Sequence, residues 1–556
     1  MRRVFSMLVM AGSFSLFGQA ECEYIQKNAE ELLVKHVGLL ASDELQGRKP
    51  GTESFSLARD YITSQFQEMG LQPAAENNFL QEFMIPEKVV IDPERNRLQV
   101  EELELNAGQG YYPVKYSSNG LVEAETHYVS YAIESEELDR DDLREKQVAG
   151  SVAVMEIGSP DGVHPHSAFL AYHDIFTRLS KLKEKGAQAV ILVDSENQRK
   201  NPAREFKKLN RVGLPVIFVE DEELAMRLIS GNNYVKLAVY LEEQSTVTHN
   251  IHAYLDNQAP LTVMIGAHYD HLGFGGESSL APKINKVHNG ADDNASGVAG
   301  LIELARFLKR TDDQTLREFN YQFIAFSAEE MGLLGSKFYV ENVENFDRVS
   351  FMFNMDMIGR LREEQLQVNG VGTSPLWEKL IETEGCRLNI VPSASGVGPS
   401  DHTSFYYKDV PVLHFFTGTH RDYHKPSDDS DLINYEGIRL TLNYMLSIIR
   451  NAPKDEPLSF EETASDNMSA PRFTVTLGVM PDYIYRGNGM RIEAVNEGKP
   501  ADRAGLKDGD VVVELGPVKV SDMQSYMQAL SQFKEGDQAK LKYRRKGKTR
   551  ETTVQF

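Results

Sequence analysis

The segment Asn289-Gly-Ala-Asp-Asp-Asn-Ala-Ser-Gly297 places two adjacent carboxylates in a glycine-bounded turn directly ahead of an apolar stretch. Residues 298–308 read apolar at helical spacing, which predicts a helix that begins just after the turn. The dipole at the N-terminus of such a helix supplies only part of the positive charge that the two carboxylates need. A metal ion could supply the rest.

Four other groups of polar residues follow apolar runs that read as buried strands. The run at residues 261–267 is followed by His268 and Asp270, and the run at 321–326 by Glu329 and Glu330. The run at 351–355 is followed by Asp356, and the run at 412–416 by a polar loop with Tyr423 and His424. In open α/β sheets the carboxyl ends of the strands line the ligand crevice. We therefore expect these four ends to meet at the Asp293 turn.

The ligand types in this set are imidazole and carboxylate, without a thiolate. Such a set fits a catalytic zinc site, or a pair of zinc ions that share a bridging carboxylate, whereas an all-oxygen set would indicate magnesium or calcium. Two metals about 3.5–4 Å apart can hold one water between them and lower its pKa towards neutrality. Glu329 directly precedes the ligand candidate Glu330 and is the natural general base.

These residues also resemble a known family, the zinc aminopeptidases of the glutamate-carboxypeptidase-II and transferrin-receptor superfamily, and among them bacterial leucyl-aminopeptidase-like peptidases. The resemblance spans about residues 30–450 and is carried, in order, by His268-x-Asp270, Gly290-Ala-Asp-Asp293-Asn-Ala-Ser-Gly297, Ala328-Glu329-Glu330-x-Gly332-Leu-x-Gly335-Ser, Asn354-Met-Asp356-Met and Tyr423-His424. It implies an α/β fold with a mixed central sheet flanked by helices. This is the phosphorylase/hydrolase-like fold of the zinc exopeptidases.

The resemblance also implies roles for these residues. Asp293 would bridge two zinc ions and be followed by a cis peptide bond, with His268 and Asp356 on one zinc, and Glu330 and His424 on the other. Asp270 would orient the His268 imidazole. Glu329 would activate the bridging water, and Tyr423 would donate a hydrogen bond to the developing oxyanion.

Several further polar residues have no assigned role in this pattern. We treat His271, His402, His414 and His420 as structural or as close to the substrate. The segment Ser400-Asp401-His402 resembles a family segment near the substrate pocket. Arg48, in a turn-rich segment, could contact substrate or another domain, or it could fix its own loop through a salt bridge.

The N-terminus is typical of a secretory signal peptide at residues 1–20. A basic start is followed by a short apolar core and by small residues at the cleavage positions, and the apolar run is shorter than the roughly 20 residues that span a bilayer. We therefore expect a periplasmic or secreted protein without a membrane span. The only cysteines, Cys22 and Cys386, exclude a disulfide-dense scaffold, and whether they pair stays open.

Composition and length exclude other classes. The 556 residues carry a net charge of −23, which argues against nucleic acid or an anionic membrane as partner. At about 150 residues per domain, this length indicates about three domains.

The pattern along the chain divides it further. Residues 21–120 and 246–450 form the two parts of the peptidase domain. Short strands around one helix at residues 121–245 resemble an inserted, β-rich protease-associated (PA) domain, which carries no catalytic constellation and is expected to act as a lid that limits substrate size, or as a structural insert. Residues 451–471, with several prolines and acids, read as a linker.

Residues 472–556 resemble a PDZ domain. Leu477-Gly-Val-Met480 fits a carboxylate-binding loop ahead of a groove strand, and Pro500-Ala-x-x-Ala504-Gly-Leu-x-x-Gly509-Asp fits the helix and strand start of bacterial members. Such domains bind an extended C-terminal peptide by strand addition.

The combined interpretation is a di-zinc aminopeptidase that removes residues from peptides with a free N-terminus. Three alternatives remain: a carboxypeptidase of the same superfamily, a glutaminyl-peptide cyclase with a single zinc, and a non-catalytic binding protein on the same fold. A carboxypeptidase needs cationic side chains for the substrate carboxylate, and a cyclase or a binding protein should have changed or lost some of the ligands.

Overall fold

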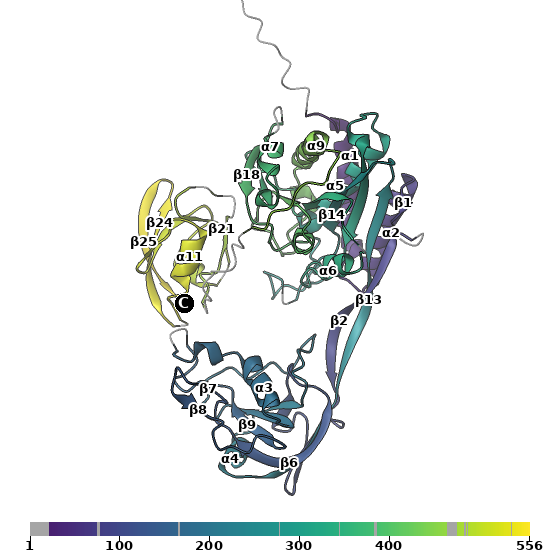
Figure 1. Ribbon diagram of the computed structural model, residues 1–556. Helices are drawn as coiled ribbons and strands as arrows, with labels where there is room; N and C mark the ends of the chain where they lie inside the picture. Colours follow the sequence, from purple (N-terminus) through teal and green to yellow (C-terminus); the bar gives the residue numbers. More distant parts are fainter. Residues whose placement is uncertain are drawn as a thin grey trace, which may run out of the picture. The chain divides into compact units, whose positions relative to one another are not determined.

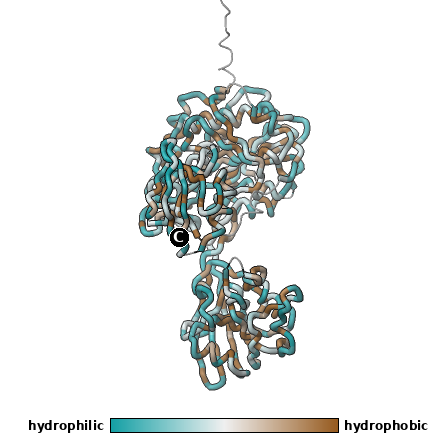
Figure 2. Tube along the Cα trace, turned by 90° about the vertical axis from the view of Figure 1, so that its left-hand side faces the viewer, coloured by the Kyte–Doolittle hydropathy of each residue, from teal (hydrophilic) through white to brown (hydrophobic). Residues whose placement is uncertain are grey.

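The computed structural model describes residues 22–556 except 75–77, 165–166, 277, 344, 383–385, 464–474, 483–484, 486, 497 and 535. The predicted signal peptide at residues 1–20 and part of the predicted linker lie outside the described residues. The chain forms two compact units, one made of residues 1–83 and 247–556 and the other of residues 84–246. Hydrophobic segments recur in both units, in keeping with separate cores (Figure 2).

The first unit is built on a nine-stranded mixed sheet, in which β14 and β13 are labelled in Figure 1. Its strands β15, β14, β16 and β19 are parallel neighbours. Its strands are β1 (Gln72–Pro73), β2 (Leu80–Ile91), β13 (Leu241–Leu255), β14 (Leu261–His268), β15 (Phe319–Phe326), β16 (Val349–Met355), β17 (Gln365–Asn369), β18 (Asn389–Ser393) and β19 (Val412–Phe416). Every residue of β14 is buried, as expected for a parallel strand that is covered on both faces. The predicted α/β class with a mixed central sheet is confirmed.

Helices cover both faces of this sheet because its strands are apolar on both sides. One core joins Ile265, Phe323 and Phe353 to α1, α2, α5 and α9, and a second core joins the alternate residues Met264 and Met352 to α6 and α8. The helices are α1 (Glu30–Leu40), α2 (Glu53–Glu68), α5 (Gly297–Arg310), α6 (Leu334–Glu341), α7 (Trp377–Ile381), α8 (His402–Tyr406) and α9 (Tyr435–Asn451). In Figure 1, α1, α5 and α9 lie together beside β14.

The second unit contains an eight-stranded sheet with α3 (Ile175–Glu184) and α4 (Glu222–Ser230). Its strands are β3 (Arg97–Val100), β4 (Leu103–Asn106), β5 (Tyr111–Pro113), β6 (Gly120–Tyr128), β9 (Val152–Glu156), β10 (Ala189–Val193), β11 (Val216–Val219) and β12 (Tyr234–Val239), beside a small hairpin of β7 (Glu134–Ser135) and β8 (Arg140–Asp141). The unit starts at Met84, not at the expected residue 121. The reason is that β3 and β5 pair with β12 and β11, far along the chain, which local patterns do not reveal.

Residues 475–556 form a separate small sheet with its own core. Its strands are β20 (Val479–Pro481), β21 (Met490–Val495), β22 (Val511–Leu515), β23 (Val518–Lys519), β24 (Gln538–Arg545) and β25 (Lys548–Gln555), with helices α10 (Pro500–Arg503) and α11 (Met523–Leu530). Gly478, in the predicted carboxylate-binding loop, has a φ of +74°, a conformation that favours glycine.

Two further features concern the whole chain. Cys22 and Cys386 form a disulfide with 5.2 Å between their Cα atoms, which answers the question that the sequence left open. No helix within the described residues combines the length and the apolar character needed to cross a membrane.

Candidate metal centre

The polar residues predicted at the strand ends come together at the carboxyl edge of the central sheet. His268 is the last residue of β14, Glu329 and Glu330 follow β15, and Asp356 follows β16. Tyr423 and His424 lie in the loop after β19. Because β15, β14, β16 and β19 are parallel neighbours, their carboxyl ends share one edge, where Asp293 also lies.

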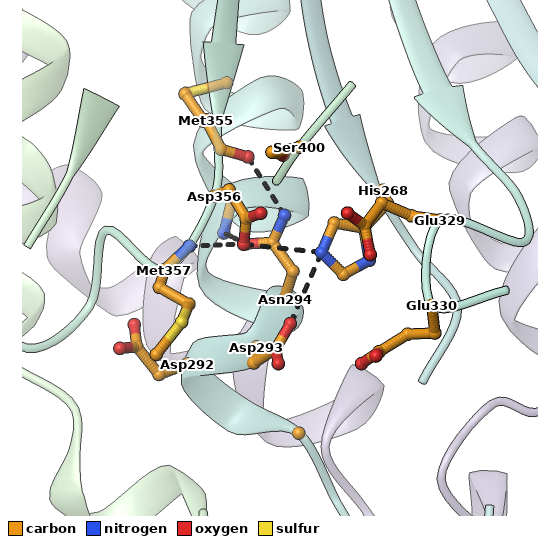
Figure 3. Close-up of polar contacts among 12 residues, drawn as sticks. His268, Asp292, Asp293, Asn294, Glu329, Glu330, Met355, Asp356, Met357 and Ser400 are labelled. Carbon is orange, nitrogen blue, oxygen red and sulfur yellow. Dashed lines mark hydrogen bonds and ion pairs between the residues drawn. The ribbon is translucent and has the colours of Figure 1, made fainter. Parts of the chain in front are cut away.

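One group consists of His268, Asp293 and Asp356. His268 Nε2 lies 3.3 Å from Asp293 Oδ1 and 3.3 Å from Asp356 Oδ1. Figure 3 shows the imidazole pointing towards both carboxylates. One ligand atom from each residue lies within 4.8 Å of the others, a spacing that a single metal ion can fill.

A second group shares Asp293 through its other oxygen. His424 Nε2 lies 3.1 Å from Asp293 Oδ2 and 3.1 Å from Glu330 Oε2. His271 joins this group, with its Nδ1 2.7 Å from Glu330 Oε1 and 4.0 Å from Asp293 Oδ2. The sequence reasoning gave His271 no role, although its position three residues after His268 at the same strand end was a usable signal.

The donor set fits metal ions of the zinc type. Imidazole nitrogens and carboxylate oxygens form two buried groups, and Asp293 offers one oxygen to each. Buried carboxylates at such short separations need positive charge between them. His268, Asp356, Glu330 and His424 could therefore hold two ions, with Asp293 between them.

The turn that carries Asp293 is tied to its surroundings through backbone and side-chain hydrogen bonds. The Asp293–Asn294 peptide bond is cis, as the resemblance implied. Asp428 Oδ2 accepts hydrogen bonds from the backbone N–H of Asp292 at 2.9 Å and of Asp293 at 3.1 Å. Asn294 Nδ2 donates to the carbonyl of Met355 at 2.9 Å, which links the turn to the end of β16 (Figure 3).

Glycine is required at the start of this turn. Gly290 has a φ of +57°, and a Cβ atom there would lie 2.2 Å from the carbonyl oxygen of Asp293 and 2.5 Å from the His271 ring. A side chain at this position would displace two of the groups that build the site.

Arg48 takes neither of the roles that we weighed from the sequence. It is 1% exposed and donates hydrogen bonds to backbone carbonyls of Tyr269, Leu40, Asn289 and Gly290 at 2.5–3.0 Å. It thus connects the residues after β14 to the turn before Asp293. Burial lowers the pKa of Arg48 to about 10, although nearby Asp293 and Asp270 raise it, so the side chain stays cationic beside the acids.

Asp270 connects the His268 strand end to the two glutamates. Its carboxylate accepts the backbone N–H of Glu329 at 3.0 Å and of Glu330 at 3.3 Å. The hydrogen bond to His268 Nδ1 is made by the Asp270 carbonyl at 3.2 Å, with the carboxylate at 3.8 Å. Asp270 therefore positions both the imidazole and the Glu329–Glu330 segment.

The electrostatics distinguish the two glutamates. Burial raises the pKa of Glu329 well above its usual value, and the nearby Asp356 raises it further. Although burial also acts on Glu330, hydrogen bonds with His271 and His424 hold its pKa at about 2. Glu330 is therefore an anion suited to a cation, and Glu329 is a carboxyl with high proton affinity. Burial and the nearby acids also raise the pKa of Tyr423, which keeps its hydroxyl protonated as a donor.

The remaining histidines lie around this centre. His420 Nε2 lies 3.1 Å from Asp292 Oδ2, behind the Asp293 turn. The rings of His402 and His414 stack with their centroids 4.5 Å apart. Ser400, in the predicted pocket segment, accepts a hydrogen bond from Asn354 at 2.8 Å.

Comparison with known proteins matches two parts of the chain. Peptidase family M28 matches residues 250–449, and the PDZ domain family matches residues 465–556. Aminopeptidase YwaD of Bacillus subtilis (strain 168) is 28% identical over 295 residues, which are 50% of this chain and 60% of that protein. Leucine aminopeptidase 2 of Trichophyton equinum is 32% identical over 171 residues, or 28% of this chain and 30% of that protein. The chain thus spans less than two thirds of the length of these two relatives.

Among solved structures, an aminopeptidase from Aneurinibacillus sp. strain AM-1 matches with a TM-score of 0.44 and 23% identity, over 80% of this chain and 98% of that one. A zinc aminopeptidase from Bacillus subtilis matches with a TM-score of 0.42 and 21% identity, over 78% of this chain and 98% of that one. Residues 250–449, which match peptidase family M28, hold all the strand-end groups described above, and the C-terminal residues 465–556 match the PDZ domain family.

Proposed function

We propose that this protein is a secreted or periplasmic di-zinc aminopeptidase that removes N-terminal residues from peptides. The observation that carries the proposal is the sharing of Asp293 between two ligand groups, with His268 and Asp356 at one oxygen and Glu330 and His424 at the other. When bound, two zinc ions supply Lewis-acid chemistry to a water and to the scissile carbonyl.

The protein's own residues carry out proton transfer, stabilise the oxyanion and bind the substrate's amino group. Glu329 takes a proton from the attacking water and passes it to the leaving amine, a role in keeping with its place in the cavity lining beside both ligand groups. The Tyr423 hydroxyl donates a hydrogen bond to the oxyanion as it develops. Asp356 and Glu329 bind the free amino group of the substrate, so activity requires an unblocked N-terminus.

The lining of the adjoining cavity favours this reaction over carboxypeptidase chemistry. A cavity of about 750 Å³ contains Asp293, Glu330 and Asp356, and its described lining residues include no arginine or lysine that could hold a substrate carboxylate. A single-zinc cyclase and an inactive binding protein are disfavoured because both ligand groups and Glu329 are present.

The disulfide supports an oxidising compartment, and the other two parts of the chain have proposed roles of their own. Disulfides such as Cys22–Cys386 persist in oxidising compartments, in keeping with export by the predicted signal peptide. We propose that residues 84–246 are a PA domain, and that the PDZ domain binds a C-terminal peptide beside β20.

The test is hydrolysis of aminoacyl-p-nitroanilides and of free and N-acetylated peptides by the mature protein. We expect release from free N-termini only, and loss of release with a chelator. Glu329→Gln should lower kcat by about 10³-fold while two zinc ions per chain remain bound, because the general base is lost and the ligands are kept. Glu341→Gln, an exposed glutamate on α6, is the matched control.

Three results would contradict the proposal. Equal cleavage of N-acetylated peptides would remove the need for a free amine. Two bound zinc ions without any release would point to carboxypeptidase or cyclase chemistry. A folded protein that binds no zinc would be a binding protein on this fold.

A further inference from the structure

A row of polar side chains crosses four adjacent strands beside the candidate metal centre. Backbone register pairs Asn354 of β16 with His414 of β19, His414 with Asn369 of β17, and Asn369 with Ser393 of β18. The row starts two residues before the candidate ligand Asp356. The flanking residues on these strands, such as Phe353, Leu413 and Val368, face the opposite side and pack in the main core.

Hydrogen bonds join two members of the row, Asn369 and His414, to Gln367 on the same face of β17. Gln367 Nε2 donates to Asn369 Oδ1 at 2.7 Å, and Asn369 Nδ2 donates to His414 Nδ1 at 3.1 Å. Because Nδ1 of His414 accepts, its hydrogen lies on Nε2. Burial lowers the pKa of His414 to about 4, so the imidazole is neutral at physiological pH.

The chain of hydrogen bonds ends in two groups without partners. Gln367 Oε1, an acceptor, and His414 Nε2, a donor, are buried and make no hydrogen bond with the described residues. A buried polar group without a partner costs about 1–3 kcal/mol. The row therefore gains stability when a bound group or water supplies the missing donor and acceptor.

Three members of this row line the same cavity as the candidate metal ligands, and Asn354 lies outside its lining. Its lining includes Gln367, Asn369, Ser393, Ser395 and His414 on this wall, and elsewhere apolar residues such as Leu280, Met357, Val397, Phe416 and Met480. Apart from His424 and the acids of the metal centre, no described lining residue carries a charge, so the wall formed by Gln367, Asn369 and His414 offers no counter-ion to a charged side chain.

We infer that this row forms a wall of the pocket for the first side chain of the substrate, and that it selects uncharged hydrogen-bonding side chains such as those of glutamine, asparagine or threonine over leucine. The inference rests on the proposed function and names its substrate class. A pocket built to hydrogen-bond a side chain rejects an apolar one, because its own polar groups then lie unpaired.

The test compares aminoacyl-p-nitroanilides in the zinc-loaded, full-length protein. The wild type should show kcat/KM values for the glutamine, asparagine or threonine compounds at least about tenfold above that for leucine, since one unpaired buried group costs that much or more. Gln367→Met combined with Asn369→Leu should shift this ratio towards leucine by a similar factor. Gln365→Met is the control, because Gln365 lies on the same strand and face but does not line the cavity.

Calorimetry of free glutamine and free leucine provides a second readout that does not depend on turnover. Glutamine should bind the wild type more tightly than leucine, and the double variant should lose that difference. A wild type that prefers leucine in both assays would overturn the inference, as would an unchanged preference in a double variant that melts like the wild type. Absence of all hydrolysis would overturn the proposed function instead. The inference about the pocket would then be decided by whether calorimetry shows tighter binding of glutamine than of leucine.

Discussion

Arg48 in the first unit and Arg178 in the second are both buried and both donate hydrogen bonds to backbone carbonyls, but their charged neighbours differ. Each is 1% exposed and donates to several backbone carbonyls, among them the carbonyl of the residue directly after a parallel strand, Tyr269 for Arg48 and Ile157 for Arg178. Arg178 donates to the carbonyls of Glu156, Ile157 and Gly158 at the end of β9, and to that of Tyr131 in the loop after β6. Burial lowers the pKa of both arginines to about 10.

The surroundings of the two arginines differ. Arg48 lies near Asp293, Asp270, Asp428 and Glu330, whose charges favour its cation. Arg178 has the cationic Arg199 as its strongest charged neighbour, and no metal-type group of histidines and acids occurs among the described residues of its unit. Similar parallel strand ends therefore yield a candidate site only where ligating side chains converge, since function depends on the site and not on the architecture.

The largest difference between the two units is expected when each buried arginine is replaced. Arg48→Met and Arg178→Met should each lower the free energy of unfolding of their own unit by about 3 kcal/mol or more, because several buried carbonyls lose their donor. Arg48→Met should also lower zinc binding and hydrolysis, whereas Arg178→Met should leave hydrolysis of aminoacyl-p-nitroanilides unchanged. Differential scanning calorimetry with zinc analysis checks this.

Arg59→Met is the control for that comparison, since Arg59 pairs with exposed Asp60 at the surface and should change stability by less than about 0.5 kcal/mol. If a folded Arg178→Met protein lost hydrolysis of these small substrates, the second unit would take part in the site, and the contrast between the two arginines would fail.

Acid should destabilise the first unit through His252. This histidine on β13 is buried, has no hydrogen-bond partner for either ring nitrogen among the described residues, and packs edge-on against Tyr339. Burial lowers its pKa to about 4, below the value of about 6.5 in an unfolded chain. The unfolded state therefore binds the proton first, so stability is complete above pH 6.5 and falls by up to about 3 kcal/mol as the pH drops to 4.

Unfolding by urea at several pH values measures this loss. His252→Leu should make the profile of the first unit less steep between pH 6.5 and 4, where His414 still contributes, and the transition of residues 84–246 should not change. An identical slope in the wild type and the variant would show that His252 does not titrate in this range.

The smallest effect is expected from the disulfide, which also belongs to the first unit. Cys22→Ser with Cys386→Ser should lower the free energy of unfolding by about 2 kcal/mol, because the unfolded chain loses a cross-link between residues separated by 364 positions. Thermal unfolding with and without a reductant measures it, and the reductant should have no further effect on the double variant. A lower melting temperature of the second unit would contradict this assignment.

Most strands and ligand candidates could be read directly from the chain. The apolar run at residues 412–416 coincides with β19, and the run at 261–267 lies within β14. His268 and Asp356 were recognisable because each directly follows such a run, and Glu330 because it comes four residues after the run at 321–326. A buried parallel strand is a short apolar segment, and the polar residue after it is a local feature of the sequence.

Other features depended on contacts between distant residues. The start of the second unit at Met84, the pairing of Cys22 with Cys386 and the carbonyl partners of Arg48 each join residues far apart in the chain. His271 could have been proposed from its neighbours, but its 2.7 Å contact with Glu330 needed two strand ends in place.

The sequence by itself determined the chemistry of this protein: which carboxylates and imidazoles follow the strands, and hence which ions suit them. Only the tertiary structure decided how those groups divide around Asp293, and how Asn354, His414, Asn369 and Ser393 align into one row. The physical reason is that ligand type and strand pattern are local properties. Strand order and register determine which side chains lie next to one another on a face of the sheet, and both result from packing across the whole sheet.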